Sequence, residues 1–193
     1  DINNLTETQR EELTLFVVDL INQARKATGS TQVVANKSAM DFANEVAKTA
    51  TTQTDHDTVA IPTAAAKFGL TSVQGTNYYE DLGMFGTASK QITMDYLKKM
   101  TYSQIVAMLL KDNLSNWGHA KSIAGFMNEN SRYIGVAVSG ANENLSNNIV
   151  ILNGAIHILG VSDSDIEDSS KFNVTSNLTS RDLKAELATA KST

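Results

Sequence analysis

The sequence contains no cysteine, and this absence excludes several kinds of site at once. Without thiols the chain has no disulfide, no thiolate-bound metal and no cysteine nucleophile. Secreted eukaryotic domains often carry disulfides, whereas cytosolic proteins do not. We therefore expect either a cytosolic protein or an exported protein of Gram-positive bacteria, in which cysteine is commonly avoided.

Basic residues, aromatic residues and long apolar runs are also scarce. Lys and Arg number 16 against 21 Asp and Glu, which gives a net charge of −5. This balance argues against a nucleic-acid binder that neutralises phosphates. No apolar run reaches ~18 residues, so we expect no transmembrane segment. The opening Asp-Ile-Asn-Asn is not a signal peptide, which suggests a cytosolic protein or a signal outside this sequence.

What is present fits a globular fold. The chain has 193 residues, of which 41% are hydrophobic and 19% are charged. These values indicate one folded domain, or one domain and a short tail, and argue against disorder.

Two helices are predicted in the first quarter of the chain. Thr6 and Gln9 form a predicted capping box, and Gly29 stands where a helix should end. The stripe between them has helical spacing and consists of Leu13, Phe16, Val17, Leu20, Ile21 and Ala24. Asn36 or Ser38 is expected to cap a second, alanine-rich helix that ends near Ala50.

The next segment, residues 51–90, has no clear periodicity and is predicted to be irregular. Irregular segments of this length in a compact domain tend to be functional. Helical spacing returns at Thr93, with a break expected near Thr101, and a short helix is predicted over 119–127.

Two strands are predicted next, over 133–138 and 149–159, joined by a polar loop over 139–148. Helices followed by paired strands indicate the α+β class. The domain is expected to span residues 5–160. Residues 161–193 are expected to form a polar linker and the start of a helical stalk, with Leu183 and Leu187 four apart; a coiled coil is only suggested by so short a pattern.

The candidate chemistry lies in three histidines and two acids. Imidazole is a common metal ligand and a common general base, so His56, His119 and His157 stand out, with Glu80 and Asp112 as acidic partners. Simpler alternatives stay open for three of these residues. His56 could be a solvated loop residue, His157 a half-exposed strand residue or a satisfied core residue, and Asp112 a helix-end residue.

The order of several motifs resembles the CAP superfamily of cysteine-rich secretory, antigen-five and pathogenesis-related proteins. The opening "LINQARKATG" contains N-x-x-R at Asn22 and Arg25, and "AMDFANEVAK" precedes His56. Glu80-Asp81-Leu82 resembles the family's E-N-L, Gly118-His119 its G-H, and "YIGVAVSG" its paired strand. The match spans about residues 8–160.

A narrower resemblance is to the surface-exclusion proteins of Gram-positive conjugative plasmids. The segments that carry it are "LTETQREELTLFVVDLINQAR", "MTYSQIVAMLLKDN" and "NWGHAKSIAG". This resemblance implies a domain presented outside the cell, at the cell wall, on a coiled-coil stalk that could also mediate oligomerisation.

The resemblance implies a three-layer α-β-α sandwich with a central antiparallel sheet and a groove. The family's tetrad of two histidines and two acids maps onto His56, Glu80, Asp112 and His119. His56 and His119 would hold a divalent metal, with zinc as the first expectation and no other cofactor. The second acid is usually Glu in the family, so the shorter Asp112 departs from the pattern.

Three functions follow as alternatives. The first is contact with a surface protein such as an adhesin, which would limit conjugation without catalysis. The second is a metal-dependent peptidase, in which a carboxylate, Glu80 or Asp112, takes a proton from metal-bound water. The third is binding of a lipid or another small ligand in the groove.

Overall fold

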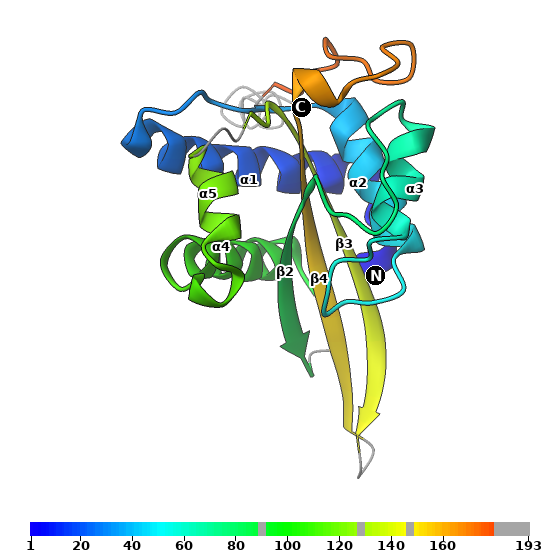
Figure 1. Cartoon of the computed structure of the whole chain (residues 1–193). Coiled ribbons are helices and arrows are strands. Elements are labelled where there is room, and N and C mark those ends of the chain that lie inside the picture. Colours follow the sequence, from blue (N-terminus) through cyan, green and yellow to red (C-terminus); the bar gives the residue numbers. More distant parts are fainter. Residues whose placement is uncertain (89–91, 127–129, 146–148, 180–193) are drawn as a thin grey trace, which may run out of the picture.

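The structure is a computed structural model that describes residues 1–88, 92–126, 130–145 and 149–179. A four-stranded sheet forms its centre, with the strand order β1-β3-β4-β2. These strands are β1 (Val34–Ala35), β2 (Glu80–Thr87), β3 (Tyr133–Leu145) and β4 (Ile149–Val161). Figure 1 shows β3, β4 and β2 side by side. The predicted hairpin is confirmed, because β3 and β4 pair antiparallel along their whole length. β2 is also antiparallel to β4, whereas the short β1 is parallel to β3.

One face of the sheet packs against three helices. They are α1 (Glu7–Thr28), α4 (Met94–Leu110) and α5 (Gly118–Ala124). Buried side chains from these helices form one apolar cluster with alternate residues of β3 and β4, among them Val136, Ile156 and Ile158. This alternation places every second strand residue on the same face of the sheet.

The opposite face packs against α2 (Lys37–Thr49) and α3 (Ala60–Lys67). A second apolar cluster joins these helices to the intervening strand residues, such as Ala137 and Leu159. The two clusters and the sheet make three layers, which confirms the predicted α+β sandwich (Figure 1). Among the residues that the structure describes, no helix is both long and apolar enough to cross a membrane.

The predicted helix caps are present. The Thr6 hydroxyl accepts from the Gln9 backbone N–H, and the Gln9 side chain accepts from the Thr6 backbone N–H. Gly29 ends α1 with a φ of 73°, a left-handed conformation that glycine adopts at no steric cost. Asn36, and not Ser38, caps α2 by accepting from the Ala39 backbone N–H.

Several predicted boundaries are wrong. Residues 51–90 are not irregular throughout, because they contain α3 and β2. α4 continues through Thr101, whose side chain is buried, without a break. β3 and β4 extend well into the segment 139–148 that was predicted to be a polar loop, because cross-strand pairing stabilises polar residues in a ribbon.

The segment after Val161 also differs from expectation. A polar linker was predicted to begin here, yet Phe172 is only 1% exposed and its ring packs edge-on against Tyr133, with centroids 5.8 Å apart. The Leu178 backbone N–H donates to the Ala35 carbonyl, so this segment also caps the sheet edge beside β1. Leu183 and Leu187 of the predicted stalk lie outside the described residues.

Candidate functional site

The structure brings His56, Glu80 and His119 together around one pocket. Its volume is about 300 Å³, and Asp81 and Ser122 also line it. The two imidazole rings are inclined by 37°, with centroids 6.1 Å apart. His56 comes from the loop before α3, Glu80 from the first position of β2, and His119 from the first turn of α5.

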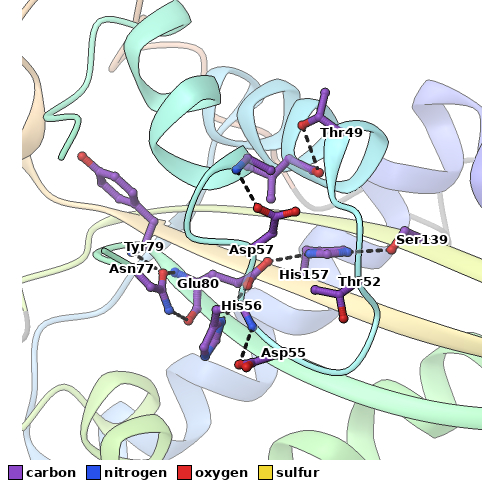
Figure 2. Close-up of polar contacts among 12 residues, drawn as sticks. Thr49, Thr52, Asp55, His56, Asp57, Asn77, Tyr79, Glu80, Ser139 and His157 are labelled. Atoms are coloured by element: carbon purple, nitrogen blue, oxygen red, sulfur yellow. Dashed lines mark hydrogen bonds and ion pairs between the residues drawn. The ribbon is translucent and has the colours of Figure 1, made fainter. Parts of the chain in front are cut away.

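Glu80 orients the His56 imidazole. The Nδ1 atom of His56 lies 2.7 Å from Oε2 of Glu80 (Figure 2). Asn77 fixes the backbone of Glu80, since its side-chain oxygen accepts from the Glu80 N–H and its amide donates to the Glu80 carbonyl. The hydrogen bond to Glu80 raises the pKa of His56 because it favours the protonated ring.

The loop that carries His56 is fixed by the next residue, Asp57. Its carboxylate accepts from the Thr51 backbone and hydroxyl on one side and from the Val59 and Ala60 backbone N–H groups on the other. Burial tends to raise the pKa of Asp57, but these hydrogen bonds outweigh it and lower the pKa to about 2. Asp57 therefore closes the loop and begins α3, which places His56 over β2.

Asp112 orients His119 in the same manner. Its Oδ1 lies 2.7 Å from Nδ1 of His119, while Oδ2 accepts from the Ala120 backbone N–H at 3.1 Å. Between them, Asn116 and Trp117 both have left-handed φ angles, which turn the chain sharply back toward Asp112. Burial tends to raise the pKa of Asp112, but the hydrogen bonds from Ser115 and His119 lower it. Asp112 thus contacts the site through His119 and does not line the pocket itself.

Glu80 has a second imidazole partner that the sequence interpretation did not assign to the site. Oε1 of Glu80 lies 2.5 Å from Nδ1 of His157, and Nε2 of His157 lies 2.8 Å from the Ser139 hydroxyl (Figure 2). His157 is 1% exposed, which agrees with the satisfied core histidine that was one alternative. Burial tends to raise the pKa of Glu80, but its hydrogen bonds with His157 and His56 lower it. Only the strand register, which the sequence does not show, would have joined these residues.

The two residues of the N-x-x-R motif, Asn22 and Arg25, hold backbone segments in place. Asn22 binds both backbone groups of Val33, and so fixes the chain that enters β1. Arg25, which is 2% exposed, donates to the carbonyls of Ser122, Ile123 and Ser131. Because Ser122 and Ser131 line the pocket, Arg25 fixes the backbone of one pocket wall.

The imidazoles of His56 and His119 are suited to bind a divalent metal through their Nε2 atoms. Each ring uses Nδ1 for a carboxylate, while Nε2 of His56 and of His119 has no partner in the part of the chain that the structure describes. A carboxylate on Nδ1 fixes the tautomer that leaves Nε2 as the metal ligand. No third His, Asp or Glu in the described ranges converges with them on a common point, so water or a ligand would complete the coordination.

Comparisons with known proteins agree with the fold and the motif order. The family described as "CAP: Cysteine-rich secretory protein family" matches residues 18–157. Among solved structures, the CAP domain of Enterococcal PrgA matches with a TM-score of 0.78 and 28% sequence identity, over 98% of this chain and 76% of that one. No curated protein sequence matches. Since the family match covers most of the chain, and despite the absence of cysteine, the chain belongs to the CAP family.

Proposed function

We propose that this chain is the CAP domain of an extracellular, cell-wall-presented protein that limits conjugative plasmid transfer. The observation that carries the proposal is the similarity to the CAP domain of Enterococcal PrgA over nearly the whole chain. In this proposal the domain acts by contact with a surface component of the partner cell, such as an adhesin. The net charge of −5 suits a protein partner better than nucleic acid.

A mating assay tests the role in conjugation. Recipient cells that display the full-length protein should receive a conjugative plasmid less often than recipients that lack it. The His56→Ala/His119→Ala variant, displayed at the same level, should retain this effect if contact alone is sufficient. Equal transfer into cells with and without the displayed wild-type protein would contradict the proposal.

A second candidate function is metal-dependent hydrolysis of a surface protein. The observation that favours it is the pair of imidazoles, each held by a carboxylate on Nδ1, in one pocket. His56 and His119 would hold the ion through Nε2, and a bound divalent ion, with zinc first, lowers the pKa of water to about 7. Both oxygens of Glu80 accept from imidazoles, and both oxygens of Asp112 are hydrogen-bonded. We therefore assign these carboxylates to orientation of the rings.

The experiment for hydrolysis is incubation of the purified domain with a candidate adhesin, with and without a chelator, followed by gel electrophoresis. We expect cleavage that requires metal and is lost in His119→Ala, while the thermal midpoint changes by only a few degrees. Undiminished cleavage by His119→Ala would contradict the assignment of the site. Absence of cleavage by the wild type with any metal would favour the contact role. No specific observation favours a lipid, because the pocket lining is mainly polar.

A further inference from the structure

A row of polar side chains crosses three strands on the face of the sheet that α2 covers. Ser139 belongs to β3, His157 to β4 and Glu80 to β2. The strand register pairs Ala137 with His157 and Ser139 with Ala155, so Ser139 and His157 are diagonal neighbours on one face. All three residues are at most 5% exposed, so their polar groups must find partners within the protein.

The hydrogen bonds that link Ser139, His157 and Glu80 are those expected of an activated serine. Nε2 of His157 is 2.8 Å from the Ser139 hydroxyl, and Nδ1 is 2.5 Å from Oε1 of Glu80. A carboxylate on Nδ1 keeps the proton there, so that the Nε2 lone pair accepts from the serine hydroxyl. Covalent catalysis typically uses a nucleophile that is hydrogen-bonded to a general base, and a third group orients that base.

Ser139 also lines a cavity of about 290 Å³ that is separate from the His56 pocket, since the two linings have no residue in common. Asn44, Lys48 and Gln53 line the same cavity. None of these three side chains has a hydrogen-bond partner among the described residues. The cavity therefore combines the serine with unpaired donors, one of them cationic, that could bind a carbonyl or carboxylate oxygen.

We propose that Ser139, His157 and Glu80 form a second site that hydrolyses esters of small carboxylic acids. The volume is at the lower end of ligand pockets, about 300 Å³, which suits a short acyl group. The Ser139 oxygen attacks the carbonyl carbon as its proton passes to Nε2 of His157, and the leaving alkoxide takes that proton. Water then attacks the acyl-serine, giving one proton to His157 and from there to Ser139, and the acid is released.

The test is covalent labelling by a small fluorophosphonate probe, in which the serine oxygen displaces fluoride from phosphorus. The purified wild-type domain, in the presence of a chelator, should gain the mass of one probe at pH 8, and peptide mapping should place it on Ser139. Ser139→Ala should abolish labelling. His157→Gln should slow it by about 100-fold, as expected for loss of a general base.

Ser103→Ala is the matched control, because Ser103 is an exposed serine on α4 whose hydroxyl donates only to the Lys99 carbonyl. It should label at the wild-type rate. Circular dichroism and thermal melts show that each variant is folded. Absence of labelling in the folded wild type, or labelling only at another residue, would overturn the proposal. Since the chelator removes any ion at His56 and His119, failure of the metal site would leave this result unchanged.

Discussion

Glu80 is the residue on which both candidate sites depend, because each of its oxygens accepts from a different imidazole. Glutamine at this position offers one acceptor and one donor, so it can satisfy only one Nδ1–H group. We expect Glu80→Gln to weaken Zn²⁺ binding by about 10–100-fold, the usual effect of losing an outer-shell partner. Calorimetry measures this change, and Glu167→Gln, an exposed acid, serves as the control. Unchanged affinity in Glu80→Gln would show that Glu80 does not orient a metal ligand.

Gly135 of β3 lies directly against the backbone of α2. A Cβ atom there would lie 2.0 Å from the Ala39 backbone oxygen, which only a backbone shift could relieve. We expect Gly135→Ala to reduce the free energy of unfolding by about 3 kcal/mol, the upper end for overpacking. Gly86→Ala is the matched control in β2, since its Cβ would meet side chains at an ordinary 3.7 Å. Urea unfolding of both variants measures the difference in their free energies of unfolding. Equal stability of the two variants would contradict the close approach of Gly135 to the Ala39 backbone.

At the scale of elements, the loop before α3 is held by Asp57. Asp57→Ala should cost about 1–2 kcal/mol at pH 7, as for the loss of a helix cap. Because the folded pKa is about 2, below the ordinary 3.8, this stabilisation is present above pH 3.8 and is lost as the pH falls through 2. The difference in unfolding free energy between wild type and Asp57→Ala should therefore shrink below pH 3.8.

Urea unfolding of metal-free protein between pH 7 and pH 2 measures this difference. Asp19→Ala, which removes an exposed acid on α1, should show a smaller and flatter effect. A difference for Asp57→Ala that stays constant down to pH 2 would mean that the carboxylate does not act in its ionised form.

The elements that the sequence predicts well are those whose apolar spacing and caps agree. α1 has both a capping box and a terminal glycine, and the β3–β4 hairpin has alternating apolar residues. β2 was missed because its first four residues, from Glu80 to Gly83, are all buried and include two acids and a glycine, so no alternation marks its start. The tertiary contacts of Glu80 stabilise this strand, and they depend on residues far away in the sequence.

The predicted and the unpredicted residues of the site differ in whether strand register is needed to bring them together. His56, Glu80 and His119 were found through the order of family motifs, and the structure places them around one pocket. Asp112 was inferred as a partner, and it contacts His119. Ser139 and His157 could not be linked in advance, because a shift of one residue in strand register would place them on opposite faces.

At the scale of the whole molecule, the extent of the domain is testable by truncation. The predicted boundary at residue 160 would remove Phe172, whose buried ring packs on Tyr133. Losing a buried phenylalanine costs about 3–5 kcal/mol, which corresponds to a drop of about 10 °C in the thermal midpoint. A chain ending at Thr179 should melt within a few degrees of the full chain, whereas one ending at Gly160 should melt about 10 °C lower. Equal midpoints would support the boundary at 160.

The presentation of the domain on a helical stalk, and any oligomer formed through it, stay predictions that concern residues after Thr179. In the described part of the chain, the imidazoles of His56 and His119 share a pocket, and a separate carboxylate orients each of them. The paired orientation is what would make Nε2 of both rings available to a single ion.

Isothermal titration of Zn²⁺ into the metal-free domain tests this arrangement most directly, with wild type compared with His56→Ala/His119→Ala. We expect one ion to bind per wild-type chain, and the double variant to lose this binding while its thermal midpoint stays within a few degrees. Glu167→Ala, which removes an exposed acid that does not line the pocket, is the control and should bind as wild type does. Equal zinc binding by the wild type and by His56→Ala/His119→Ala, or no binding by either, would contradict the account.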